Sequence, residues 1–358
     1  MKLLSPLKSS IELKNKIVMA PMTRSRASQD HIPTDIMATY YGQRSGAGLI
    51  ITEGTAPSEN GIGYARIPGI YNAAQTAAWQ KVTAAVHENG GKIFVQLMHT
   101  GRVSHPKNMP EHAIIVAPSP IAPEDTKMYV DGEGELEIPE PKEMTLDDIS
   151  LAVSEYVSAA ENAIKAGFDG VELHAANGYL LEQFINTGAN KRTDQYGGSH
   201  ENRARIVLEI AEKTIKAIGA EKVGIRLSPN GAFNGVGPFE GQKETFDYLA
   251  EKLNDLELVY VHLVNHESMG ALPLPDDIRE SIREKFNGLL ILSGGYDKES
   301  AEADLQENKG DLIAFGRPYV ANPDLVERFE KDAELQEPNQ DLLYTPGKEG
   351  YIDYPTLS

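Results

Sequence analysis

The chain has 358 residues, no cysteine and a formal net charge of −19, from 53 acidic residues against 34 Lys and Arg. The lack of cysteine excludes disulfides, iron–sulfur clusters, thiolate zinc sites and cysteine nucleophiles. Because so acidic a surface repels phosphate backbones and anionic lipid, we expect neither nucleic acid nor membrane partners. The apolar runs are far shorter than a membrane span, and the N-terminus lacks a signal-peptide pattern, so we expect a cytoplasmic protein.

Short apolar runs alternate with longer helical patterns along the chain. The runs are rich in Val, Ile and Leu, which is typical of strands covered on both faces. Strands are predicted over 17–20, 48–52, 92–97, 168–173, 222–227, 258–263, 289–293 and 311–315. Helices are predicted over 34–45, 73–89, 146–165, 199–217, 242–254, 275–285, 298–308 and 322–330.

This alternation favours a single α/β domain over residues 1–358, a (β/α)8 TIM barrel with an N-terminal lid segment. An open doubly wound sheet is the alternative, but no glycine-rich dinucleotide turn follows an early strand. Residues 98–144, after the third strand, hold seven prolines and are predicted to form a capping excursion. A surface excursion without a role is the alternative there. The C-terminal tail, 345–358, is expected near the barrel mouth.

Glycines follow the last two predicted strands, at the barrel end where active sites of this fold form. Gly294 and Gly295 follow the seventh strand, and Gly316 and Arg317 follow the eighth. Backbone N–H groups at glycines can approach a phosphate closely, and an arginine adds a fixed pair of donors. These residues therefore predict an anion site, although glycines also end strands simply to make turns.

Gln96 and Arg226 lie at two further strand ends. A glutamine side chain offers an acceptor and two donors, which suits an imide-like edge. A buried arginine needs an anion nearby, or a group that becomes one. The alternative for Arg226 is an ion pair with Glu172 or Glu53.

The loop HAANGY, residues 174–179, follows the fourth strand and carries three hydrogen-bonding side chains. His174 and Asn177 could direct two donors at one carbonyl oxygen and stabilise negative charge that grows there. Tyr179 is a weak acid that could protonate a carbanion-like centre. Together they predict addition across an activated C=C bond, whereas each residue alone is more typical of a structural role.

These residues lie in stretches that strongly resemble the Old Yellow Enzyme family of FMN-dependent ene-reductases. The resemblance runs along essentially the whole chain and includes IVMAPMTRSRA (17–27), LIITEGT (49–55), QLMHTGR (96–102), the 40-residue block 171–210, IRLSP (225–229), LSGGY (292–296) and AFGRPYVANPDL (314–325). It implies a ping-pong enzyme in which NADPH, or less favourably NADH, reduces bound FMN. An electron-poor alkene (an α,β-unsaturated carbonyl, a nitroalkene or a maleimide) then receives hydride from flavin N5.

The resemblance also implies a role for individual residues. Tyr179 matches the proton donor, and His174 and Asn177 match the pair that binds the substrate carbonyl. The pocket wall is matched by Tyr64, Met98 and Tyr351, with Met98 standing where many bacterial relatives have tryptophan. The implied FMN contacts are Pro21, Met22, Thr23, Gly54, Thr55, Gln96, His174, Arg226, Gly294, Gly295, Gly316 and Arg317. We expect a monomer or weak homodimer.

Two rival functions use the same residues differently. A metal-dependent barrel hydrolase would draw its ligands from His99, His174, His262, His266 and Glu172, but their spacing matches no known ligand motif, so no metal is expected. The second rival is a flavin-binding protein without turnover, against which the intact HAANGY loop argues.

Overall fold

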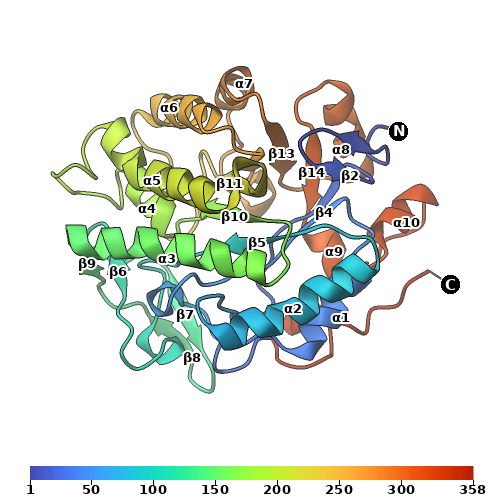
Figure 1. The fold of residues 1–358 in the computed structure, drawn as a ribbon, viewed down its shortest axis with the longest axis horizontal. Helices are drawn as coiled ribbons and strands as arrows, with labels where there is room; N and C mark the ends of the chain where they lie inside the picture. Colours follow the sequence, from blue (N-terminus) through green and yellow to red (C-terminus); the bar gives the residue numbers. More distant parts are fainter. Residues whose placement is uncertain (358) are drawn as a thin grey trace.

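Eight short apolar runs form a closed barrel of parallel strands in the computed structural model, which describes residues 1–357 (Figure 1). The expected (β/α)8 fold is therefore confirmed. In barrel order the strands are β10 (Gly170–Ala175), β11 (Val223–Leu227), β12 (Tyr260–Val264), β13 (Leu289–Ser293), β14 (Leu312–Phe315), β3 (Ile17–Met19), β4 (Leu49–Ile51) and β5 (Ile93–Leu97).

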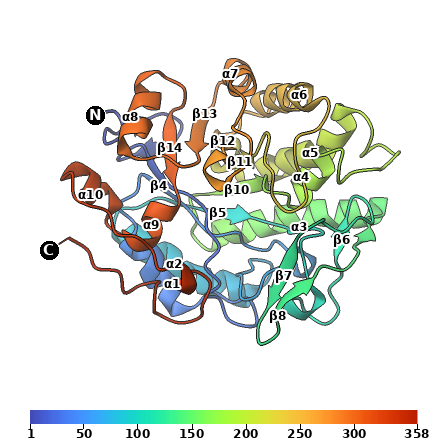
Figure 2. The same ribbon diagram turned by 180° about the vertical axis from the view of Figure 1, so that it is seen from behind.

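Helices cover the outside of the barrel (Figures 1 and 2). Those that match the predicted ones are α1 (Asp35–Gln43), α2 (Ala73–Glu88), α3 (Leu146–Lys165), α5 (His200–Ile218), α6 (Gln242–Asp255), α7 (Asp276–Lys285), α8 (Lys298–Gln306) and α10 (Leu325–Glu330). The side chain of Thr145 accepts a hydrogen bond from the backbone of Asp148 and so begins α3, as Ser199 begins α5. Two short helices lie outside the predicted ones, α4 (Leu180–Ile185) and α9 (Arg317–Ala321). No helix among residues 1–357 has the length and apolarity that crossing a bilayer requires.

Aliphatic side chains and two aromatic rings fill the barrel interior near the amino ends of the strands. Phe94 and Tyr260 lie with ring centroids 5.8 Å apart. Gly170 and Gly224 make room for them, because a Cβ atom at either glycine would overlap one of these rings. Side chains at this level close the barrel, so any opening lies above them, at the carboxyl ends of the strands.

The N-terminal segment closes the opposite end of the barrel with a hairpin of β1 (Leu7–Lys8) and β2 (Glu12–Leu13). Ile11 and Leu13 pack with residues that begin the strands, such as Leu289 and Leu312. The lid segment thus covers the amino ends of the strands and leaves the carboxyl ends accessible.

Residues 98–144 contain two small sheets. A parallel pair joins β6 (Val116–Ala117) to β9 (Lys142–Glu143), and an antiparallel hairpin joins β7 (Lys127–Val130) to β8 (Gly134–Glu137). Met128 and Ile138 from this segment share an apolar cluster with Tyr179, which places the excursion beside the HAANGY loop.

Candidate active site at the carboxyl ends of the strands

The strand ends bring Gln96, His174 and Arg226 together inside the barrel mouth. In the sheet register, Gln96 lies opposite Glu172, and His174 lies opposite Arg226. Each of the three predicted side chains has 7 % of its surface or less exposed. The predicted residues of β5, β10 and β11 therefore form one buried polar layer.

Arg226 has no ion-pair partner within 4.0 Å among the described residues. Glu172 instead accepts hydrogen bonds from Gln96 (2.7 Å) and His262 (2.8 Å). Glu53 accepts one from the backbone of Arg24. The alternative of an ion pair with Glu172 or Glu53 is therefore wrong. Burial lowers the pKa of Arg226, and the charge of Glu172 opposes that shift. A buried cation without a direct partner is costly, and an anionic ligand would offset that cost.

The HAANGY loop is held by a buried carboxylate. Asn177 and Gly178 both adopt positive φ, at 59° and 75°. The Gly178 N–H donates to Glu182 (2.5 Å), the Asn177 N–H donates to the Ser228 hydroxyl (3.0 Å), and that hydroxyl donates to Glu182 (2.8 Å). The Asn234 amide donates to the carbonyl of Asn177 (2.8 Å). These bonds fix the backbone from which Asn177 projects.

Tyr179 follows this loop, and its ring meets that of His174 edge-on at 4.9 Å. Its hydroxyl is hydrogen-bonded to that of Tyr64, at 3.0 Å. Burial raises the pKa of Tyr179, and the bond to Tyr64 opposes the rise, so the phenol stays protonated at neutral pH. Burial and the charge of Arg226 hold the pKa of His174 well below its usual range, so its imidazole is neutral. A neutral imidazole can donate one N–H, and a protonated phenol can deliver a proton.

Three buried polar atoms in this layer lack any hydrogen-bond partner: His174 Nδ1, Asn177 Oδ1 and Arg226 Nε. Native proteins rarely leave buried polar atoms unpaired unless a ligand or water satisfies them. The donors and acceptors that remain fit a flat, polar-edged group such as FMN together with a carbonyl compound.

The predicted residues at the remaining strand ends surround this layer. Gly294 and Gly295 both have positive φ, at 129° and 74°, and a Cβ at Gly294 would overlap the Asn265 carbonyl. Gly316 precedes α9, and the Arg317 side chain is exposed. Pro21, Met22 and Thr23, after β3, are half-buried, and Thr55, after β4, is fully buried.

Met98 packs tightly beneath Gly54. A Cβ at position 54 would overlap the Met98 thioether, and only 1 % of Met98 is exposed. Met98 shares its apolar cluster with Tyr179 and with the partly buried Tyr64. The structure thus brings Tyr64 and Met98 next to Tyr179.

Tyr351 does not lie where the sequence placed it. Its ring has no exposed surface and stacks on Tyr40 at 4.0 Å, so it packs in the core and does not line an accessible pocket. The tyrosine that sequence reasoning missed is Tyr344, which is 60 % exposed and raises the pKa of both Tyr64 and Tyr179 in addition to the larger effect of burial. Its backbone carbonyl is held by Arg66 (2.8 Å). Both tyrosines lie in the irregular C-terminal segment, where no strand or helix pattern distinguishes them.

The histidines of the hydrolase alternative do not converge. No group of three or more His, Asp or Glu side chains within residues 1–357 could hold a metal ion. His99 accepts a hydrogen bond from the Gly101 N–H (3.0 Å), and burial lowers its pKa to about 3. His262 is bound to Glu172, as described above.

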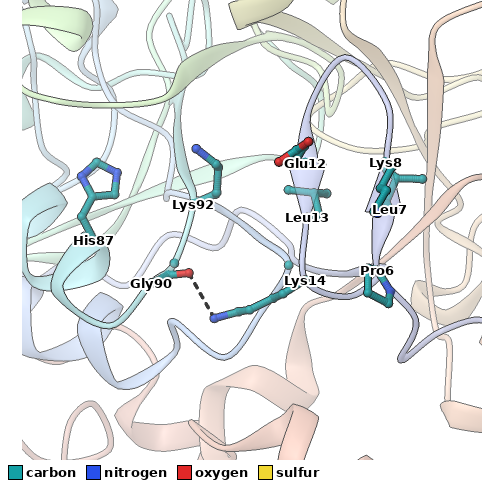
Figure 3. Close-up of a pocket in the computed structure, with 11 residues that line it drawn as sticks. Pro6, Leu7, Lys8, Glu12, Leu13, Lys14, His87, Gly90 and Lys92 are labelled. Atoms are coloured by element: carbon teal, nitrogen blue, oxygen red, sulfur yellow. Dashed lines mark hydrogen bonds between the residues drawn. The ribbon is translucent and has the colours of Figure 1, made fainter.

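A cavity of about 470 Å³ lies at the opposite end of the barrel, beside the N-terminal hairpin (Figure 3). Lys8, Lys14 and Lys92 line it. Lys14 donates to backbone carbonyls, including that of Gly90, and Lys92 is paired with Asp169 (2.9 Å). None of the predicted site residues lines this cavity, so the chemistry is assigned to the carboxyl ends of the strands.

The sequence profile of the NADH:flavin oxidoreductase / NADH oxidase family matches residues 2–336. The chain belongs to this family. It is 39 % identical to a probable flavin mononucleotide-dependent alkene reductase of Leishmania infantum, over 96 % of this chain and 94 % of that one. It is 40 % identical to a putative 12-oxophytodienoate reductase 3 of Oryza sativa subsp. japonica, over 99 % and 92 % of the two chains.

Solved structures agree. Morphinone reductase is 44 % identical and superposes with a TM-score of 0.96, over 99 % of this chain and 96 % of that one. An Old Yellow Enzyme homologue from Zymomonas mobilis is 39 % identical with a TM-score of 0.95, over 100 % of both chains. The resemblance to the Old Yellow Enzyme family is thereby confirmed. The protein is an FMN-dependent oxidoreductase that uses a nicotinamide reductant to reduce activated alkenes.

Proposed function

We propose that Gln96, His174 and Arg226 hold FMN at the barrel mouth, with Gln96 at the imide edge. The unpaired guanidinium of Arg226 supports this assignment, because it would lie beside the part of the ring that gains negative charge on reduction. Thr23, Gly54 and Thr55 with Pro21 and Met22 would line the ring, and Gly294, Gly295, Gly316 and Arg317 would bind the phosphate. When bound, FMN supplies hydride transfer between the nicotinamide and the alkene.

His174 and Asn177 bind the carbonyl or nitro oxygen of the alkene. The single observation that carries this role is that no hydrogen bond among the described residues uses the ring nitrogens of His174 or the side-chain amide of Asn177, so an imidazole N–H and an amide N–H remain free to donate beside Tyr179. Tyr179 then donates its proton to the α-carbon of the substrate, and the Tyr64 hydroxyl stabilises the resulting phenolate. Tyr64 and Met98 form the pocket wall next to them.

For the reductant we propose NADPH, as the family resemblance implies. A solved complex of morphinone reductase with tetrahydroNAD makes NADH the alternative. The ratio of kcat/KM for the two dinucleotides, measured with one alkene, decides between them.

Single-turnover kinetics test the residue roles. Tyr179→Phe is expected to leave FMN binding and the nicotinamide half-reaction unchanged and to slow the alkene half-reaction about 100-fold or more. The double variant His174→Ala, Asn177→Ala is expected to lose phenol binding. Equal losses in both half-reactions of Tyr179→Phe would refute the proton-donor role, and an unaltered phenol-induced change in the flavin spectrum would refute the oxygen-binding role.

A further inference from the structure

A buried hydrogen-bonded network lies below the site and joins Gln96 to Glu172 and His262, two residues to which no role has been assigned above. Glu172 of β10 and His262 of β12 are both fully buried inside the barrel, on strands separated by β11. The carboxylate accepts from Gln96 Nε2 through Oε1 (2.7 Å), and His262 Nδ1 lies 2.8 Å from Oε2. Burial lowers the pKa of His262, so with Nδ1 donating its neutral ring accepts at Nε2 from the hydroxyl of Ser293 (3.0 Å), whose oxygen also lies 3.1 Å from the Leu263 carbonyl oxygen.

Hydrogen accounting fixes the orientation of the Gln96 amide. An ionised carboxylate only accepts hydrogen bonds, so the amide nitrogen of Gln96, and not its oxygen, must face Glu172. His262 donates from Nδ1 to the other carboxylate oxygen, which anchors Glu172 in turn. The amide oxygen of Gln96 and its second N–H remain for another partner, since no hydrogen bond among the described residues uses Gln96 Oε1.

The same network explains why Arg226 stays available. Each oxygen of Glu172 already has a close donor, and no side-chain nitrogen of Arg226 comes within 4.0 Å of it. A carboxylate buried without such donors would carry a large desolvation cost, so its place inside the barrel requires Gln96 and His262 as partners.

We propose that Glu172, anchored by His262, is a positioning residue that sets which end of the Gln96 amide faces the barrel mouth. Gln96 then presents one acceptor and one donor, in a fixed order, to the N3–H and the adjacent carbonyl of the FMN pyrimidine ring. The proposal rests on the assignment of Gln96 to the imide edge made above. It predicts that the protein distinguishes flavins by the hydrogen-bonding pattern of that edge and that Glu172 is required for this discrimination.

The test compares the binding of FMN and of 3-deaza-FMN, in which a C–H group replaces N3–H, to the reconstituted apoprotein by flavin fluorescence. We expect wild type to bind the analogue about tenfold more weakly, because the amide oxygen of Gln96 loses its donor. In Glu172→Gln, residue 172 presents both a donor and an acceptor, so the side-chain amide of Gln96 can face it in either orientation. We expect FMN itself to bind about tenfold more weakly there, and the ratio between the two flavins to fall below about threefold.

Ser293→Ala is the matched control, because it perturbs the far end of the network and leaves Glu172, His262 and Gln96 in contact. It is expected to keep both the affinity for FMN and the tenfold ratio. A ratio of tenfold retained in Glu172→Gln overturns the positioning role. A ratio of one in wild type instead overturns the assignment of Gln96 to the imide edge, so the two failures are distinct.

A wild-type measurement covers the case in which Glu172→Gln does not fold. In a ¹⁵N-labelled sample, one proton of the Gln96 side-chain amide is expected far downfield and slow to exchange, as for a donor held by a buried carboxylate. The two amide protons exchanging with each other at the rate of an exposed glutamine would overturn the proposal.

Discussion

Glu182 offers the sharpest test of how the substrate-binding loop is held. Its two carboxylate oxygens accept from the Gly178 N–H (2.5 Å) and the Ser228 hydroxyl (2.8 Å), and Ser228 in turn accepts from Asn177 (3.0 Å). In Glu182→Gln the amide oxygen can keep the Gly178 N–H, but the Ser228 hydroxyl must turn to accept from the new amide nitrogen, so both bonds lose their charged partner. Burial raises the pKa of Glu182 to about 7, so at pH 8 its carboxyl group is ionised, and weakening its two hydrogen bonds costs about 1.5–3 kcal/mol. If about half of that loss reaches the oxygen-binding geometry of Asn177, ligand affinity falls about 4- to 13-fold.

The assay is titration of the oxidised enzyme with an uncharged ketone that perturbs the flavin spectrum. Glu182→Gln is expected to raise its Kd about tenfold while the Kd for FMN stays within about twofold. Glu209→Gln is the matched control. Glu209 lies on the outer helix α5 and accepts one hydrogen bond, from the hydroxyl of Tyr196. A folded Glu182→Gln variant with an unaltered Kd for the ketone would refute the proposal that Glu182 holds the substrate-binding loop in place.

The remaining predictions concern Tyr64, Glu53 and Arg226. Tyr64→Phe removes the hydrogen bond that opposes the rise in the pKa of Tyr179. The alkene half-reaction should therefore slow about tenfold while the nicotinamide half-reaction is unchanged. Stopped-flow measurement of the two half-reactions checks this. Burial raises the pKa of Glu53 to about 7 from 4.5, so the folded state binds the extra proton and the free energy of unfolding should fall as pH rises from about 5 to 8, by up to about 3 kcal/mol. Urea unfolding of wild type and Glu53→Gln should show this difference, and parallel curves would contradict it. Arg226→Met should raise the free energy of unfolding of the apoprotein by about 1–3 kcal/mol and weaken FMN binding, whereas destabilisation of the apoprotein would mean that the cation is already compensated.

The barrel itself could be predicted from sequence because each strand is a continuous apolar run. Residues 222–227 were expected as a strand and Val223–Leu227 form one, since burial on both faces leaves no polar alternation to confuse the pattern. Helix α4 was not foreseen because all six of its residues are buried, so it lacks the periodicity of a surface helix. The β7–β8 hairpin did have a local signal, the Asp131-Gly132 pair, which is typical of a tight turn.

The site could be predicted only as far as its residues follow strand ends. Gln96, His174 and Arg226 were foreseen because the fold gathers strand ends at one mouth. The partners of Glu172 were not, because Gln96 and His262 are 76 and 90 positions away in sequence. Which side chain neutralises which charge is decided by the register of neighbouring strands, and no local pattern reports it.

The cost of this arrangement follows from the same geometry. The register places Glu172 two residues below the paired His174 and Arg226, so a hydrogen-bond partner taken by Glu172 is lost to Arg226. His262 and Gln96 already donate to both oxygens of Glu172. The guanidinium of Arg226 therefore has no hydrogen-bond partner at Nε, although it lies in a low-dielectric interior. The apoprotein therefore carries a destabilising charge that an anionic ring edge relieves, and binding and stability are coupled through it. Affinity for the cofactor thus depends on leaving this one cation without a protein partner.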